Sequence, residues 1–219
     1  MIKLDNINKI YNIGKTAVKA LQDINLEIKK GEFVGIVGQS GSGKTTLSNI
    51  IAGLLSPSSG IVTIEGNNIW NFNDRKMSLF RNKTLGFVFQ SFNLIPEMTA
   101  LENVMLPLAY SKIKYKKRVE LAKEELIKVG LEKRMYHKPI ELSGGQMQRV
   151  SIARAMINKP KIIIADEPTG NLDSVSSETV MNLIKEINEK GVTVLMVTHN
   201  LEYEKYFAKI IKLKDGKLI

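Results

Sequence analysis

Residues 38–46 combine the residue types that can bind a phosphate chain. Their sequence, GQSGSGKTT, contains a glycine, four variable residues, a second glycine, a lysine and a threonine. Glycines let backbone N–H groups turn inward around phosphate oxygens, and a lysine at this spacing reaches the β- and γ-phosphates while a following hydroxyl faces Mg²⁺. The spacing therefore predicts a nucleotide-phosphate site. The predicted binding residues are Gly38, Gln39, Ser40, Gly41, Ser42, Gly43, Lys44, Thr45 and Thr46.

The segments on either side of this loop predict how it is held. Residues 33–37, FVGIV, form an apolar, β-branched run typical of a buried strand, and the stretch KTTLSNIIAGLL is compatible with a helix. A strand, glycine loop and helix in this order are the context that the phosphate-binding motif requires. The helix N-terminus would add its partial positive charge to the site. A glycine-rich turn without a ligand is the alternative, but it does not explain this agreement.

Two further apolar runs end in polar residues that could act on a phosphate group. The run IIIA is followed by Asp166 and Glu167, and the run TLGFVF is followed by Gln90. Ligands collect at the carboxyl ends of strands in parallel α/β sheets. Asp166 is placed to hold Mg²⁺ through water, Glu167 to polarise the attacking water as general base, and Gln90 to reach both. The predicted metal ligands are Thr45, Gln90 and Asp166.

Two single residues have weaker patterns, and each has a structural alternative. His199 lies two residues beyond the run VTVLMV, where its imidazole could meet the γ-phosphate, although a lone histidine is more often structural. Tyr11 lies between strands predicted over residues 2–8 and 18–28, at the exit of the first one. Its ring offers the flat apolar surface that adenine requires, although such a tyrosine more often belongs to the core or the surface.

Helical signals follow Gln90, over residues 91–159. Thr99 and Glu102 have the spacing of a capping box, which predicts a helix start near Ala100. Residues 114–129 carry apolar side chains at helical spacing, and Gly130 suits the position after the helix end.

A second glycine segment, LSGGQ at residues 142–146, precedes a helix predicted to run to about Met156. Ser143 suits the N-cap, and bare glycines at a helix N-terminus make a second anion site. A simple glycine-containing helix start is the alternative.

Composition limits the function classes. The 43% hydrophobic content of the 219 residues supports one large domain or a core with an inserted lobe. No cysteine is present, which excludes a disulfide framework and a thiolate metal site. No apolar run approaches the ~20 residues of a membrane span, and the N-terminus lacks a signal peptide's apolar core, so we expect a soluble, cytoplasmic protein. The net charge of +10 favours a solvated lysine-rich surface over anionic lipid, and nucleic acid is the least favoured partner.

The order of these motifs resembles that of ABC transporter ATP-binding subunits over essentially the full chain. The stretch GFVFQSFNLIPEMTALENVMLPL further resembles the subgroup of macrolide exporters and lipoprotein-release systems. Gln39 stands where proline is common in this subgroup, at a variable motif position where we expect no functional loss. The matching pieces are Tyr11 as A-loop, GQSGSGKTT as Walker A, Gln90 as Q-loop, LSGGQ as signature, IIIADE as Walker B, GNLD at 170–173 as D-loop and His199 as switch histidine.

The resemblance implies a fold class, a domain organisation and an activity. The fold is an α/β P-loop NTPase (RecA-like) core with an antiparallel β subdomain and an inserted α-helical subdomain. A single ABC ATPase domain spans residues 1–219, with residues 1–90 and 160–219 as the core and β subdomain and residues 91–159 as the helical signature subdomain. The implied activity is Mg²⁺-dependent ATP hydrolysis. The implied catalytic residues are Glu167, His199, Gln90 and Lys44.

The resemblance also implies partners. Two subunits pair head-to-tail in the ATP-bound state, and the signature of one contacts ATP on the Walker A loop of the other. The signature residues are Ser143, Gly144, Gly145 and Gln146. This homodimer drives an integral membrane permease through the surface beside Gln90, which puts the chain on the inner face of the cell membrane. The alternative is a soluble ABC-type ATPase acting on nucleic acid or ribosomes, although the sequence shows no coiled coil, zinc module or second ATPase unit.

Overall fold

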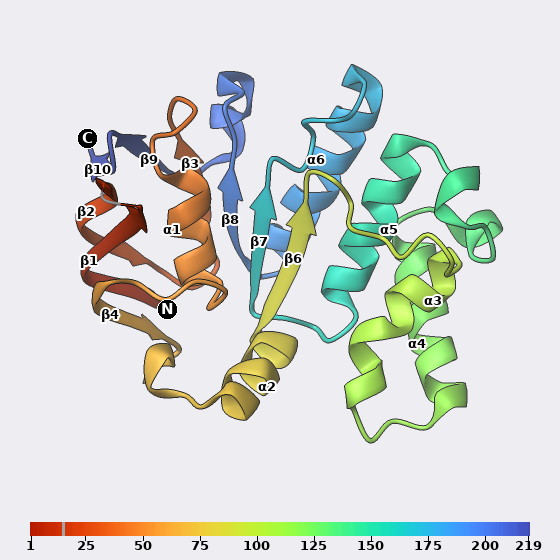
Figure 1. Ribbon diagram of the computed structural model, residues 1–219. Helices are drawn as coiled ribbons and strands as arrows, with labels where there is room; N and C mark the ends of the chain where they lie inside the picture. Colours follow the sequence, from red (N-terminus) through yellow and green to blue (C-terminus); the bar gives the residue numbers. More distant parts are fainter. Residues whose placement is uncertain (15) are drawn as a thin grey trace. The chain divides into compact units, whose positions relative to one another are not determined.

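The computed structural model describes residues 1–14 and 16–219, and the chain divides into two compact units (Figure 1). The first unit comprises residues 1–81 and 191–219, and the second comprises residues 82–190. The second unit therefore contains two strands and a helix that the sequence-based division places in the core, at residues 85–89, 162–166 and 174–189. The subdomain limits at residues 90 and 160 stay a prediction.

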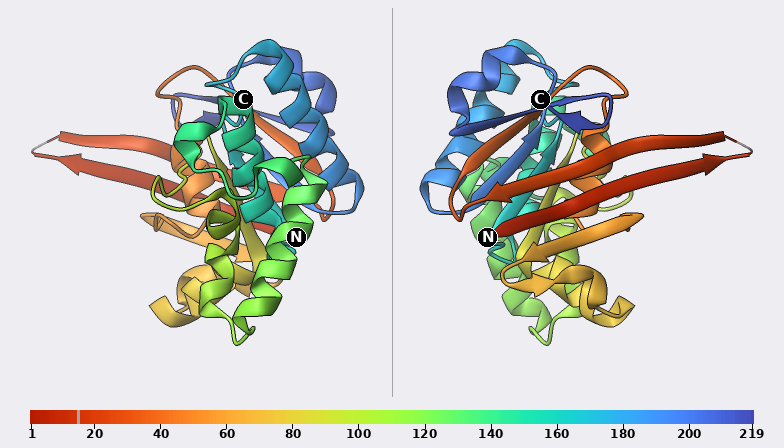
Figure 2. Two further views of the ribbon diagram at one scale, coloured as in Figure 1. Left: turned by 90° about the vertical axis from the view of Figure 1, so that its right-hand side faces the viewer. Right: turned by 90° about the vertical axis from the view of Figure 1, so that its left-hand side faces the viewer.

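An antiparallel sheet in the order β2-β1-β4-β5 forms one part of the first unit. Strands β1 (Ile2–Ile13) and β2 (Thr16–Ile28) make a hairpin that extends as a long two-stranded arm (Figure 2). Strand β4 (Ser59–Ile64) pairs with β1, and β5 (Asn67–Asn68) pairs with β4. Buried apolar side chains hold the base of the hairpin, whereas Ile10, Tyr11 and Val18 farther along the arm are exposed.

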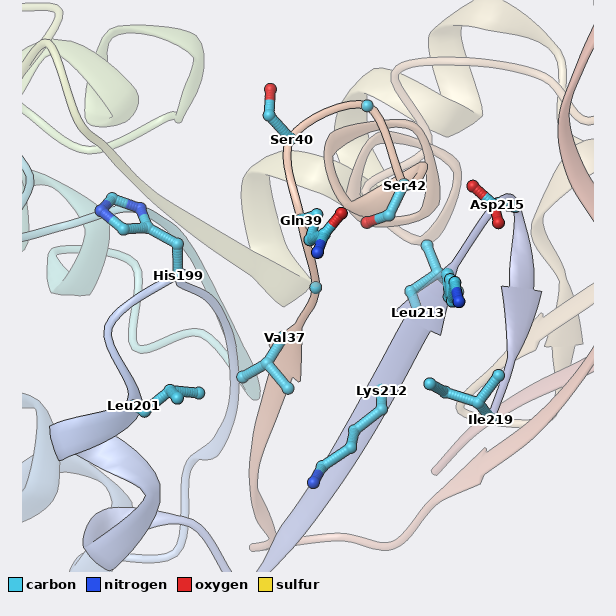
Figure 3. A pocket seen from close by; sticks show the side chains of 13 residues that line it. Val37, Gln39, Ser40, Ser42, His199, Leu201, Lys212, Leu213, Asp215 and Ile219 are labelled. Atoms are coloured by element: carbon cyan, nitrogen blue, oxygen red, sulfur yellow. The ribbon is translucent and has the colours of Figure 1, made fainter.

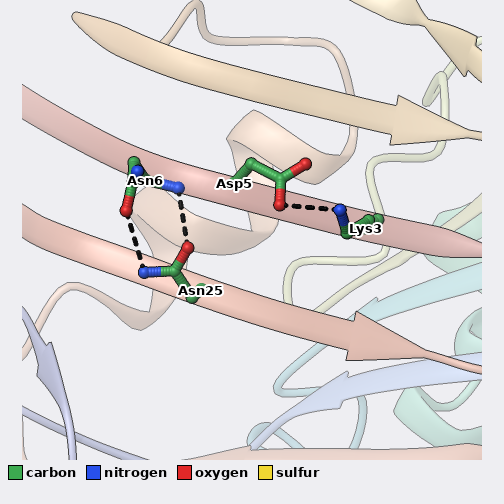
Figure 4. A network of polar contacts seen from close by, with 4 residues as sticks. All are labelled: Lys3, Asp5, Asn6 and Asn25. Atoms are coloured by element: carbon green, nitrogen blue, oxygen red, sulfur yellow. Dashed lines mark hydrogen bonds and ion pairs between the residues drawn. The ribbon is translucent and has the colours of Figure 1, made fainter.

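A bulge interrupts the register of the hairpin between Leu4 and Ile7, where Asn6 has a positive φ of 48°. Asn25 on the neighbouring strand compensates for the irregularity, since its Oδ1 accepts from the Asn6 backbone N–H at 2.9 Å and its Nδ2 donates to Asn6 Oδ1 at 3.1 Å (Figure 4). A surface ion pair joins Lys3 and Asp5 at 3.0 Å on the same strand. The two amide contacts therefore restore the backbone pairing that the bulge removes.

The phosphate loop is positioned by a mixed sheet in the same unit. Strand β3 (Phe33–Val37) runs parallel to β8 (Thr193–Val197) on one side and to β9 (Lys209–Lys214) on the other, and β10 (Lys217–Leu218) closes a hairpin with β9. All residues of β3 and β8 are buried, which explains why both read as continuous apolar runs. Helix α1 (Lys44–Ile51) follows β3, as predicted, and contacts β8.

The second unit combines two parallel strands with a group of helices. Strands β6 (Leu85–Phe89) and β7 (Ile162–Asp166) pair from Leu85 opposite Ile162 to Phe89 opposite Asp166. The α-helices of this unit are α3 (Ala100–Met105), α4 (Tyr115–Lys128), α5 (Gly144–Met156) and α6 (Ser174–Glu189). Helix α2 (Asp74–Thr84) leads from the first unit into the second, and short 3-10 turns lie at 69–71, 106–110, 132–134, 139–141 and 201–206.

Local sequence signals located the helix ends well. Thr99 caps α3 in a complete capping box with Glu102, and the hydrogen bonds from the Thr99 backbone N–H and hydroxyl lower the pKa of the Glu102 carboxyl. Gly130 follows α4 with a φ of +68°. The prediction for the first strand was wrong, because β1 continues past residue 8 to Ile13.

Candidate functional site

The phosphate loop of the first unit is pre-organised by its own lysine. Lys44 is buried, and its Nζ donates to the carbonyl oxygens of Gly38 at 2.7 Å and Gln39 at 2.8 Å. The ammonium group therefore lies inside the loop that precedes it. Gly43 takes a φ of +104°, and a Cβ there would lie 2.6 Å from the Ala20 carbonyl oxygen. Glycine is required at that position by conformation and by space.

The N–H groups at the start of α1 and the Ser42 hydroxyl could each form a hydrogen bond with a phosphate. The N-cap of α1 is Gly43, so no side chain caps the first N–H groups of the helix. Ser42 is 5% exposed, and its Oγ has no hydrogen-bond partner within the described part of the chain. A helix N-terminus with free donors and a buried, unpaired hydroxyl fit an anionic ligand such as a nucleotide phosphate.

His199 shares a pocket with the phosphate loop. The pocket has a volume of about 580 Å³ and is lined by residues 37–42, by His199 and Leu201, and by the end of the β9–β10 hairpin. Figure 3 shows the imidazole on one side of the loop and Leu213, Asp215 and Ile219 on the other. The prediction of His199 beyond the end of a buried strand is confirmed, since β8 ends at Val197.

Tyr11 lies elsewhere in the first unit, on the hairpin arm. It is paired with Val18 inside the β1–β2 ladder, so the predicted position at a strand exit was wrong. The residue is 36% exposed, and the Lys9 ammonium lies 5.3 Å from the ring centroid. An exposed ring beside a cation is available for stacking.

Gln90 and Glu167 follow neighbouring strand ends in the second unit. Phe89, the last residue of β6, is opposite Asp166, the last residue of β7. Gln90 and Glu167 therefore directly follow two strand ends that lie side by side. Glu167 has a φ of +48°, an uncommon conformation for a residue with a side chain. The predicted strand-end placement of Gln90, Asp166 and Glu167 is thus confirmed, while their chemical roles stay predictions.

The signature segment begins helix α5 with a closed cap. Ser143 Oγ accepts from the Gln146 N–H at 3.3 Å, and Gln146 Oε1 accepts from the Ser143 N–H at 3.0 Å. Gly145 is buried, and a Cβ there would lie 2.6 Å from Ser176 Oγ, so this glycine allows α5 to approach α6. Ser143 was predicted as the N-cap, but the reciprocal bond, which Gln146 Oε1 accepts from the Ser143 N–H, was not predicted although the spacing is that of a capping box.

Two groups of contacts around Gln90 were not predicted. Gln148 of α5 donates through Nε2 to the carbonyl oxygens of Phe89 at 3.2 Å and Pro168 at 2.5 Å. The Asn171 side chain contacts both the backbone and the side chain of Gln90. Such contacts join residues far apart in the sequence, and only the glutamine and asparagine residue types hinted at them.

No group of three histidine or acidic side chains that could hold a metal alone occurs within residues 1–14 and 16–219. Mg²⁺ does not require such a cage, because it usually binds one or two protein oxygens together with substrate phosphates and water. Thr45 in the first unit, and Gln90 and Asp166 in the second, carry oxygen atoms of the type that Mg²⁺ prefers, and their role as its ligands stays a prediction. In the same described ranges, the helices are too short or too polar to cross a bilayer.

Residues 21–170 match the family model described as ABC transporter. This chain belongs to the ABC transporter family. It is 48% identical to the lipoprotein-releasing system ATP-binding protein LolD of Francisella tularensis subsp. holarctica, over all of this chain and 95% of that protein. It is 44% identical to the macrolide export ATP-binding/permease protein MacB of Aggregatibacter actinomycetemcomitans, over all of this chain and 34% of that longer protein.

A solved ABC cassette has the same fold. The dimeric structure of an ATP-binding cassette in a post-hydrolysis state, bound to ADP and Pi, matches with a TM-score of 0.92 and 47% identity. The match covers all of this chain and 96% of that one. The predictions of an ABC ATPase subunit, of a P-loop NTPase fold and of the exporter and lipoprotein-release subgroup are confirmed.

Proposed function

We propose that this chain hydrolyses ATP to power a membrane transporter of the lipoprotein-release or macrolide-export type. The observation that carries the proposal is the phosphate loop of the ABC cassette, with Lys44 held inside it and the N-terminus of α1 uncapped. The matched cassette bound to ADP and Pi supports both nucleotide binding and hydrolysis.

The first unit supplies the nucleotide-binding residues in this proposal. Lys44 exchanges its bonds to loop carbonyls for bonds to the β- and γ-phosphates, residues 38–46 surround the phosphates, and Tyr11 stacks on adenine. His199 contacts the γ-phosphate. When bound, Mg²⁺ would neutralise charge on the phosphates, and its proposed ligands are Thr45 of this unit and, from the second unit, Gln90 and Asp166.

The second unit supplies the residues that act on water and on the partner's nucleotide. Glu167 removes a proton from the attacking water, and Gln90 orients that water. Ser143, Gly144, Gly145 and Gln146 contact ATP held by a second copy of the chain, so that ATP links an ATP-bound homodimer. The dimeric form of the matched cassette supports this assembly.

The permease is the proposed membrane partner, and it places the chain at the inner face of the cell membrane. The segment after Gln90 offers four apolar side chains that are each half-buried, so part of every one is accessible: Phe92, Leu94, Ile95 and Met98. Partly exposed apolar clusters often mark interaction sites. The relatives reported above are named for lipoprotein release and for macrolide export, and neither name supports the nucleic-acid or ribosome alternative.

ATP hydrolysis by single variants tests the chemistry. Glu167→Gln is expected to retain ATP binding and to lose about 10²–10⁴ in turnover rate, the usual contribution of a general base. Glu178→Gln, an exposed glutamate on α6, is the matched control and should turn over like the parent. Full turnover by Glu167→Gln would falsify the assignment of the general base.

A further inference from the structure

The backbone around Gln90 is fixed from both sides in the second unit. Gln148 donates to the Phe89 carbonyl at 3.2 Å, and Arg154 donates to the carbonyl oxygens of Phe92 at 2.8 Å and Asn93 at 2.5 Å. Burial lowers the pKa of Arg154. Because the main chain is held on either side of Gln90, the side-chain carboxamide is the part of this residue whose orientation can still vary.

The Asn171 side chain determines that orientation. Its Nδ2 lies 3.1 Å from the backbone carbonyl of Gln90, and a carbonyl can only accept, so the NH₂ group of Asn171 must face it. Asn171 Oδ1 then faces the Gln90 side chain and accepts from Nε2 at 3.4 Å. Because Nε2 is directed to Asn171, the carboxamide presents Oε1, its only acceptor atom, away from that contact.

Gly170 leaves the space in which the carboxamide lies. A Cβ at residue 170 would be 2.6 Å from Gln90 Nε2 and 3.0 Å from its Cδ. The φ of Gly170 is not positive, so the absence of a side chain there serves space rather than backbone conformation. Any larger residue would displace the Gln90 amide.

We infer that Asn171 and Gly170 are positioning residues that keep Gln90 Oε1, the atom that would bind the metal, out of the contact with Asn171 and available as a ligand. The inference rests on the proposed role of Gln90 as a Mg²⁺ ligand. An amide that turns over would present an NH₂ group, which cannot coordinate a cation. Asn171 therefore acts through Gln90 and not on the nucleotide. Residues behind a metal ligand typically change metal affinity or activity about 10–100-fold when they are removed.

A double-mutant cycle on metal affinity tests the inference. Mn²⁺ binding to the full chain with a non-hydrolysable ATP analogue is measured by the loss of the free-ion electron paramagnetic resonance signal. Asn171→Ala and Gly170→Ala should each weaken Mn²⁺ about 10-fold. Asn182→Ala, an exposed asparagine on α6, is the matched control and should not change it. Thermal melting of each variant confirms folding, and KM for ATP at saturating metal should stay within about 2-fold while kcat falls.

The cycle separates this inference from the proposed function. Adding Asn171→Ala to Gln90→Ala should cause no further loss of Mn²⁺ affinity, because Asn171 acts only through that side chain. Additive losses would overturn the inference, as would unchanged affinity in Asn171→Ala beside a weakened Gln90→Ala. If Gln90→Ala alone binds Mn²⁺ normally, the metal role of Gln90 fails and the inference fails with it.

Discussion

Helices α1 and α5 both begin in glycine-rich segments, but their N-termini are built differently. The N-cap of helix α1 is Gly43, which has a left-handed backbone and provides no side-chain cap. The N-cap of helix α5 is Ser143, which forms a closed box with Gln146 through bonds of 3.3 and 3.0 Å. One helix end leaves its donors for a ligand, and the other uses them internally.

This difference suggests why the two ends would respond to different parts of a nucleotide. At the N-terminus of α1, Lys44 already lies inside the loop and no side chain caps the helix. A phosphate can therefore bind there without breaking a cap hydrogen bond. A ligand at α5 must compete with the Ser143 hydroxyl for a backbone N–H. A charged phosphate oxygen accepts a stronger hydrogen bond than a hydroxyl, so a γ-phosphate can win this exchange.

The largest expected effect separates the two helix ends by function. Lys44→Ala should abolish nucleotide binding to the isolated chain, whereas Ser143→Arg should leave it within about 2-fold and lose at least about 100-fold in ATP turnover, the scale expected when a charge-stabilising donor is blocked. Nucleotide affinity by titration calorimetry and turnover by phosphate release measure the contrast. Loss of nucleotide affinity in Ser143→Arg would contradict it.

A smaller effect concerns the cap itself. Ser143→Ala should lower the free energy of unfolding by about 0.5–2 kcal/mol, because an N-terminal hydrogen bond of α5 is lost. Thr99→Ala removes the equivalent cap of α3 in the same unit and should cost a similar amount. Denaturant unfolding of both variants measures the two losses. Only Ser143→Ala should also weaken ATP-dependent self-association, and an equal weakening in Thr99→Ala would show that the effect comes from stability.

Short-range patterns predicted much of this molecule. The strand, loop and helix around Lys44, the box at Thr99 and the end of α4 before Gly130 each depend on residues a few positions apart. The length of the β1–β2 arm could not be predicted, since Ile10 and Val18 are exposed and no buried pattern marks where the ladder ends.

The features of the site that the sequence did not predict are mostly contacts between residues far apart in the chain. Gln90 and Asn171 are 81 positions apart, and nothing in the local sequence of either one specifies the other. The positive φ of Glu167 depends on the surrounding structure, because the residue type disfavours it. The box at Ser143 was readable from the spacing of serine and Gln146, a signal that the glycines obscured.

Sedimentation of the Glu167→Gln chain with ATP and with ADP tests most directly whether the α5 N-terminus takes up the γ-phosphate of a partner's nucleotide. Hydrolysis should be about 10²–10⁴-fold slower in this variant, so ATP should convert the chain from monomer to dimer with two ATP molecules bound. ADP has no γ-phosphate and should leave it monomeric, as should the absence of nucleotide. The same mass with ATP and with ADP, up to the solubility limit, would contradict the ATP-linked dimer.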